Sequence, residues 1–287
     1  MKKIKPNKIR NHSLSDQIGQ TALVVCLTVI GILMLFPFFW AFSTSLRLPK
    51  DSFSLPPAFF PTEWRWENYA YIFKALPFGR YLINSIVVVV SIVAVSLLFS
   101  SMAAFSFAKL HFKGQNIMFI YIICGLMIPF QSIVVAQFLI VSRMNLIDTP
   151  LALILPYIAN PFGIFLLRQF MAGIPNSYYD AAVIDGCNKF RIYWNVIIPM
   201  SVPSLVVVAF IQFIAQWNNF FAPLIYINST EKFTLPMGMQ TLKGFRSAGS
   251  LAYILAGVMI SLVVPSVVYI IGQKHLIKGT LLSGLKS

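Results

Sequence analysis

The chain has 287 residues, of which 58% are hydrophobic and only 10% are charged. Soluble domains are roughly half apolar and about a quarter charged, so this composition argues against a water-soluble protein. The formal net charge of +14 raises the alternative of nucleic-acid binding, because basic patches bind phosphate backbones. The arrangement of the charges along the chain favours a membrane protein instead, and no nucleic-acid partner is expected.

Six long windows of the sequence contain no Asp, Glu, Lys or Arg. A helix needs about 20 mostly apolar residues to cross the hydrocarbon core, and each window has that length or falls short by a residue or so. The sequence therefore predicts an all-α, polytopic membrane protein with a transmembrane domain at 18–273, a basic N-terminus at 1–17 and a tail at 274–287. The six predicted spans cover about 18–43, 82–108, 116–141, 151–170, 202–227 and 250–271.

The basic residues predict the orientation of the chain. If both termini lie inside, the inner segments carry more than half of the 22 Lys and Arg residues. Because Lys and Arg accumulate in cytoplasmic loops, we expect cytoplasmic termini and a location in the bacterial cell membrane, with lipid around the spans. The apolar run Thr21–Phe39 is similar to a secretory signal peptide but is too long for a typical signal core, so an uncleaved first helix is expected.

Proline residues predict several breaks between elements. The outer loop at Leu46–Arg80 is rich in proline, which argues against a regular helix there, and Pro129 interrupts the third span. A second sizeable outer loop is predicted at Asn228–Gly249. An amphipathic piece at Lys189–Ile198 is expected to stop at Pro199, before the fifth span begins.

The inner segment at 171–201 departs from the pattern of apolar spans, because it is too polar to cross a membrane. Ser177 and Asp180 match the Ser-x-x-Asp/Glu capping pattern of a helix start. Gly186 is a natural left-handed terminator about two turns later. The sequence therefore predicts a short helix over roughly Tyr178–Asp185, held between two spans as a rigid projection.

This predicted helix has features of a docking element. Ala181 and Ala182 give the helix a face with small side chains, which would let it enter a groove on another protein. Asp180 and Asp185 are placed to meet Arg or Lys in such a groove. The alternative is that both acidic residues only solvate the loop, with Asp180 stabilised at the helix start by the helix dipole. The residues alone leave both interpretations open.

The spacing within this segment resembles the EAA loop of ABC importer permeases. That family pattern has Glu-Ala-Ala, three residues, Gly, nine residues, Ile, one residue and Leu-Pro. Here Asp180-Ala181-Ala182 is followed after three residues by Gly186 and after nine more by Val196-Ile197-Ile198-Pro199. Asp replaces Glu, Val replaces Ile and Ile replaces Leu. These substitutions keep charge and apolarity, so docking is expected to survive.

The resemblance extends over nearly the whole chain. Within the family, the chain is similar to the carbohydrate-uptake, or maltose-type, branch. Other patches similar to that branch are Phe36-Pro37, Ala103–Lys109, Ile128-Pro129, Phe165–Phe170 and Trp217-Asn218-Asn219. The resemblance implies a type I ABC importer with two homologous permease subunits, two cytoplasmic ATPase subunits and an external solute-binding protein. The same resemblance implies that the solute-binding protein delivers a sugar, with an oligosaccharide as the expected substrate. It also implies that the helix at 178–186 is the coupling helix, seated in a cleft of the ATPase, with Pro199 closing the motif.

Polar residues in the fifth predicted span are candidates for a substrate pathway. Gln212, Gln216 and Asn219 recur at i, i+4 and i+7, so they line one face of a helix. Polar groups in hydrocarbon are costly and tend to face the bundle or a watery path. One interpretation is a hydrogen-bonding stripe along a sugar pathway, with Trp217 nearby for stacking and Gln131 as a weaker candidate in the third span. The other is hydrogen bonding between helices.

The sequence lacks a nucleotide site and a metal site of its own. No Gly-x-x-x-x-Gly-Lys-Ser/Thr run occurs, so ATP and Mg are expected on the partner ATPase, and the chain is not expected to be an enzyme. The 3 Cys and 3 His residues have no metal-ligand spacing. The alternative function, an ion- or proton-coupled secondary carrier, needs intramembrane carboxylates, and an intramembrane enzyme needs catalytic groups there. The predicted spans contain no Asp, Glu or His.

Overall fold

The computed structural model describes residues 14–48, 51, 59–244 and 251–284, and helices are the only regular elements among them. Four helices are long and apolar enough to cross a membrane. Two further pairs of helices, each bent at a short break, bring the number of spans to six if each pair is counted as one span. The unbent four are α1 (Leu14–Ser45), α3 (Phe78–Lys109), a continuous helix over 189–217 and α13 (Leu251–Gly284). The described residues therefore agree with the predicted all-α polytopic fold.

The third and fourth predicted spans are the bent ones. Their parts are α4 (Gln115–Cys124), η2 (Gly125–Met127) and α5 (Phe130–Arg143), then α6 (Pro150–Ile154), η3 (Leu155–Tyr157) and α7 (Pro161–Ala172). The bends measure 104° in the first pair and 42° in the second. Each bend precedes a proline, Pro129 or Pro161, and the residue before it has an extended backbone. Proline disfavours the helical conformation of its predecessor, which explains both breaks.

The two predicted outer loops contain helices. α2 (Glu67–Ala75) lies within Leu46–Arg80, so the expectation that proline excludes a regular helix there was wrong. All prolines of that loop fall outside the nine residues of α2, and burial of Ile72 against the rest of the chain stabilises the helix. In the second loop, η5 (Thr230–Lys232) and α12 (Leu235–Gly244) follow the short helix α11 (Phe221–Tyr226).

The helix before the fifth predicted span does not stop at Pro199, which corrects the prediction. α9 (Lys189–Ile192), the π-helical η4 (Tyr193–Ile197) and α10 (Ile198–Trp217) form one continuous helix. Pro199 lies in the first turn of α10, directly after the π-helical turn. Hydrogen bonds in a π-helix span five residues rather than four, which moves the preceding carbonyl groups away from the proline ring. The helix then ends at Trp217, before the predicted end at 227.

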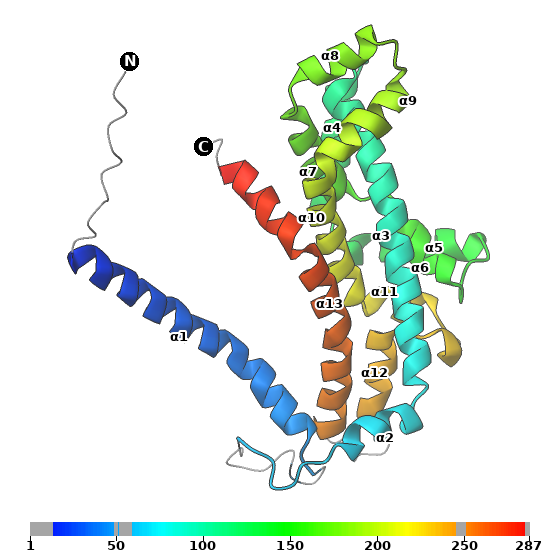
Figure 1. The fold of residues 1–287 in the computed structure, drawn as a ribbon. Helices are drawn as coiled ribbons and strands as arrows, with labels where there is room; N and C mark the ends of the chain where they lie inside the picture. Colours follow the sequence, from blue (N-terminus) through cyan, green and yellow to red (C-terminus); the bar gives the residue numbers. More distant parts are fainter. Residues whose placement is uncertain (1–13, 49–50, 52–58, 245–250, 285–287) are drawn as a thin grey trace.

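The long helices α3, α10 and α13 stand side by side, with small helices at both ends (Figure 1). α3 packs against α7 and α10, and α10 packs against α13. One end of the bundle carries α8 (Asn176–Ile184) and α9, and the opposite end carries α2 and α12. We call these the α8 end and the α2 end. α1 contacts α13 but diverges from the other helices (Figure 1), and none of its most apolar stretch is buried.

A hydrophobic core at the α8 end joins α8 to the long helices. Its buried members include Phe105 of α3, Leu167 of α7, Ala182 of α8 and Ile192 of α9. Residues from four elements thus pack in one cluster. The short helix α8 is consequently held against the bundle rather than suspended on a loop.

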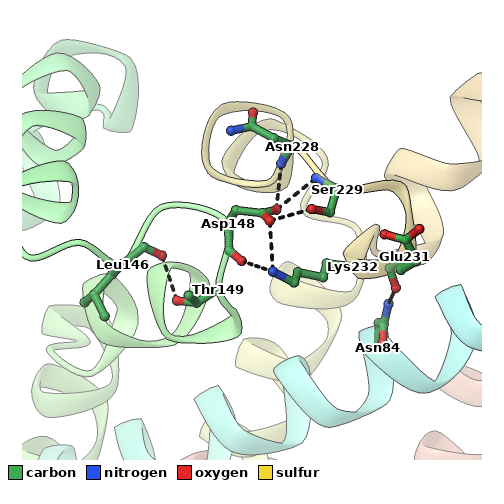
Figure 2. Close-up of polar contacts among 8 residues, drawn as sticks. All are labelled: Asn84, Leu146, Asp148, Thr149, Asn228, Ser229, Glu231 and Lys232. Carbon is green, nitrogen blue, oxygen red and sulfur yellow. Dashed lines mark hydrogen bonds and ion pairs between the residues drawn. The ribbon is translucent and has the colours of Figure 1, made fainter.

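Asp148 joins two loops that are far apart in the sequence. It lies between α5 and α6 with a left-handed φ of 61°. Its carboxylate accepts hydrogen bonds from the backbone N–H groups of Asn228 (3.0 Å) and Ser229 (2.9 Å) and from Lys232 Nζ (2.9 Å) (Figure 2). Asn84 of α3 donates to the carbonyl oxygen of Glu231 (2.8 Å), so the same loop is also bound to α3. The bonds from Lys232 and Ser229 hold the pKa of Asp148 well below its usual range.

Asp148→Asn should lower the thermal midpoint of the purified protein by a few degrees at neutral pH. A depressed pKa in the folded state means that the carboxylate adds stability above its unfolded pKa of about 3.9 and loses it as the pH falls toward the folded value. The gap between wild type and variant should therefore narrow below about pH 4. Asp185→Asn, which removes an exposed acidic group of the α8 end, serves as the control. An equal midpoint for Asp148→Asn and wild type at neutral pH would contradict this role.

Candidate functional site

The short helix α8 ends as the sequence predicts. Gly186 has a left-handed φ of 76° directly after the helix. The N–H of Gly186 donates to the carbonyl oxygen of Val183, and the N–H of Cys187 donates to that of Ala182, both at 3.0 Å. These two bonds form a Schellman motif, which satisfies the last carbonyl groups of a helix. Gly186 thus fixes the direction in which the chain leaves α8.

The start of α8 differs from the expected capping pattern. The helix begins at Asn176, and Pro175 before it makes no side-chain capping bond. Ser177 and Asp180 are both exposed within the helix. Proline has no backbone N–H, so Pro175 removes one of the donors that would need a partner at this end.

The two alanines of the motif lie on different faces of α8, contrary to the expected shared docking face. Ala182 is only 7% exposed and belongs to the core at the α8 end. Ala181 is exposed, as are Asp180, Asp185 and Gly186. A small residue at position 182 lets α8 lie close to the bundle, whereas Ala181 and the acidic residues face outward.

Large apolar side chains are exposed around α8 and α9, which the sequence interpretation missed. Ile184 is 85% exposed, more than the other large side chains of this region. We call the following set the apolar tip: Tyr178, Val183, Ile184, Phe190 and Trp194. Large exposed apolar side chains on short helices at one end of the bundle make this end a candidate interaction surface. The signal in the sequence was Val183-Ile184 between two aspartates, in a segment too polar to be a span.

Gln212 of α10, and Asn219 two residues after the end of that helix, bond to residues at the break between α6 and α7. Gln212 Oε1 accepts a hydrogen bond from Asn160 Nδ2 at 3.0 Å. Asn219 Nδ2 donates to Tyr157 Oη at 2.9 Å and to Gln216 Oε1 at 3.0 Å. Gln212 and Asn219 thus make hydrogen bonds between segments, one of the two interpretations, whereas the bond of Gln216 is local to the stripe, and a pathway role stays a prediction. These bonds satisfy polar groups in the bent fourth span, where the backbone leaves the helical conformation.

The surroundings of this stripe are tightly packed. Trp217 is 3% exposed and stacks on Phe213, with ring centroids 5.7 Å apart, so it presents no free face for a sugar. Gln131 is exposed near the start of α5. Gln216 and Asn219 line a cavity of about 10 Å³, which is roughly the space of one water molecule. This conformation holds no space for a sugar ring at that position.

The family described as the binding-protein-dependent transport system inner membrane component matches residues 96–277, which include α7, α8, α9 and α10. The chain belongs to this family. As a member it is an inner-membrane permease of a transport system that includes partner components, and such a permease is not itself catalytic. The alternative of a secondary carrier is accordingly not favoured.

Two relatives of this permease have names that mention oligosaccharides. The arabinooligosaccharides transport system permease protein AraQ of Halalkalibacterium halodurans is 34% identical over 247 residues, which cover 86% of this chain and 88% of that protein. The diacetylchitobiose uptake system permease protein NgcG of Streptomyces coelicolor is 32% identical over 220 residues, covering 76% of this chain and 72% of that protein. The resemblance noted from the EAA-like spacing is thus confirmed at the level of the family.

A solved structure shows the same fold. The crystal structure of a bacterial ABC transporter involved in the import of the acidic polysaccharide alginate contains a chain with a TM-score of 0.79 to this permease. The two are 23% identical, and the match covers 92% of this chain and 98% of that one. The shared fold therefore extends over nearly the whole chain.

Proposed function

We propose that this permease forms half of the pathway of an ATP-driven sugar importer, with an oligosaccharide as substrate, and that α8 is its coupling helix. The observation that carries this proposal is α8 itself, a short helix packed firmly on the bundle at Ala182 while its apolar tip faces outward. The names of the two relatives and of the alginate transporter support a saccharide substrate. An external solute-binding protein delivers that substrate to the pathway.

The apolar tip supplies the contact with a cytoplasmic ATPase subunit. Burying a side chain such as Ile184 in a groove contributes about 1.5–3 kcal/mol. Ala181 allows the groove to approach the helix closely, and the exposed Asp180 and Asp185 pair with Arg or Lys at its rim. Gly186 and Pro199 act within the chain, by ending α8 and by starting α10 after the π-helical turn. ATP and Mg bind to the two ATPase subunits, and their closure moves α8.

A second homologous permease subunit completes the pathway. α1 is apolar around its whole circumference and contacts only a small part of the chain. A helix of this kind is covered by lipid or by another apolar helix. We place the α8 end and both termini on the cytoplasmic side, because the basic residues of the inner segments favour this orientation. When the two permease subunits separate on one side of the membrane, the pathway becomes lined by the polar residues Gln212, Gln216, Asn219 and Gln131.

Co-purification tests this assignment. A tagged permease extracted from native membranes should bring with it a second permease of the same family and an ATPase subunit. An unrelated polytopic membrane protein with the same tag is the control for non-specific recovery. Recovery of the chain without either partner, under conditions that preserve membrane complexes, would contradict the proposed assembly.

A further inference from the structure

Lys109, the last residue of α3, binds the start of α8. Its side chain is buried, with 7% of the residue exposed. The Nζ atom donates to the carbonyl oxygen of Ile174 (2.5 Å) and to Oδ1 of Asn176 (2.8 Å). Ile174 lies in the turn that leads into α8 and Asn176 is the first residue of α8, and both are more than sixty positions from Lys109. One cation thus joins the end of a long span to the short helix.

The charge of Lys109 suits the dipole at the end of α3 but is costly where the side chain is buried against the start of α8. Removing an ammonium group from water costs several kcal/mol unless good hydrogen bonds replace the water. A cation at a helix N-terminus also opposes the helix dipole, so Lys109 is no ordinary helix-capping residue for α8. Its two bonds offset these costs only while Ile174 and Asn176 stay in place. The contact therefore favours one fixed arrangement of α3 and α8.

Two further contacts lie on the same face of α3. Ser101, Phe105 and Lys109 are spaced by four residues, which places them along one stripe of the helix. The hydroxyl of Ser101 shares a hydrogen bond of 2.7 Å with Tyr193 of η4. The ring of Phe105 lies 5.5 Å from that of Tyr193 and 6.5 Å from that of Tyr179 on α8. The stripe thus contacts both α8 and the π-helical turn that follows it.

We propose that Lys109 is a positioning residue that makes α8 and α3 move as one rigid body. This inference rests on the proposed function, in which the ATPase displaces α8. Without the contact, apolar packing around Phe105 and Ala182 still links α8 to α3, but part of a push on α8 then bends the turns at 173–175 and 186–188 instead of moving the span. With it, the displacement reaches α3 directly and passes to the α2 end, because α3 runs from one end of the bundle to the other (Figure 1).

The test measures the distance between α8 and the far end of α3 in the complete complex. The three native cysteines are replaced, and spin labels are attached at Ser177→Cys and Arg80→Cys. Pulsed electron paramagnetic resonance then gives the distance distribution without nucleotide and after trapping with ATP and vanadate. With Lys109 present, we expect a narrow distribution whose mean does not shift on trapping.

The variants separate positioning from folding. Lys109→Met should widen the distribution and shift its mean on trapping, and Asn176→Ala should do so to a smaller extent because one of the two bonds remains. Lys109→Arg should restore the narrow distribution, since a guanidinium group can donate to both oxygens. Lys113→Met, at an exposed lysine four residues further on, should behave as wild type.

Two results would overturn the role of Lys109. The first is a wild-type distance response in Lys109→Met, or in Asn176→Ala if Lys109→Met cannot be purified. The second is a widening of equal size with and without nucleotide, which indicates a folding role alone. If the proposed function itself is wrong, the result is different. The wild-type complex would then contain no ATPase and could not be trapped with ATP and vanadate.

Discussion

Ile184→Glu is expected to release the ATPase subunits from the complex while the permease stays folded. The side chain of Ile184 is 85% exposed, so its replacement removes almost no contact within the chain. In the docked state it lies in an apolar groove, where the variant loses the burial of the isoleucine and also places an unpaired carboxylate. The lost burial of about 1.5–3 kcal/mol, together with the cost of the unpaired carboxylate, should lower the affinity at least about thirtyfold.

The measurement is the amount of ATPase recovered with the tagged permease, together with ATP-dependent uptake into membrane vesicles. Ile184→Leu is the matched control, because it keeps the volume and apolarity of the side chain. This variant should retain both the recovery of the ATPase and the ATP-dependent uptake. The thermal midpoint of Ile184→Glu should equal that of wild type. An intact complex with normal uptake in this variant would show that the apolar tip is not the ATPase contact.

Gly238→Ala is expected to destabilise the protein more than the other substitutions considered above. A Cβ atom at position 238 would lie 2.2 Å from Cδ2 of Tyr81. Tyr81 is 2% exposed and lies at the start of α3, so its ring has no room to move aside. Overpacking of a buried contact costs about 1–3 kcal/mol, and this overlap places the variant at the upper end. Gly238 therefore permits the close approach of α12 to α3.

The thermal midpoint and the yield of folded protein report this effect. Gly79→Ala provides the matched control, because it makes the same change near the start of α3 where a Cβ atom meets nothing within 4 Å. That control should be neutral or slightly stabilising, since alanine favours the helix over glycine. A wild-type midpoint for Gly238→Ala would mean that α12 does not pack on α3 as described.

The sequence predicts those features that depend on composition and local spacing. Uncharged windows identify the spans, because a charge in hydrocarbon is costly wherever the neighbouring helices lie. Gly186 identifies the end of α8, because a left-handed residue is needed there and glycine adopts that conformation without strain. The EAA-like spacing around it indicates the family, which the match over residues 96–277 confirms.

Features that depend on distant contacts were not predictable. α2 forms in a proline-rich loop because Ile72 is buried against other helices, and no local pattern reports that burial. The bonds of Lys109 to Ile174 and of Asp148 to Ser229 each join residues more than sixty positions apart. Ala182 faces inward for the same reason, since helix spacing alone does not tell which side of α8 meets the bundle.

The coupling roles of Asp180, Ala181 and Asp185 stay predictions, as does a pathway role for Gln212 and Gln216. The structure places the first three on the outer face of α8, where an ATPase subunit can reach them. It gives the two glutamines partners within the chain, so a pathway role requires that these bonds open during transport. The Ile184→Glu experiment tests the outer face of α8 without depending on the pathway.

Uptake into proteoliposomes tests the central claim most directly. The purified complex is reconstituted with its solute-binding protein outside and ATP inside, and a panel of radiolabelled oligosaccharides that includes arabinooligosaccharides and diacetylchitobiose is supplied. An ATP-driven importer predicts accumulation of one member of the panel that requires internal ATP and stops with vanadate. Accumulation that continues without ATP and follows an imposed ion gradient would contradict the account.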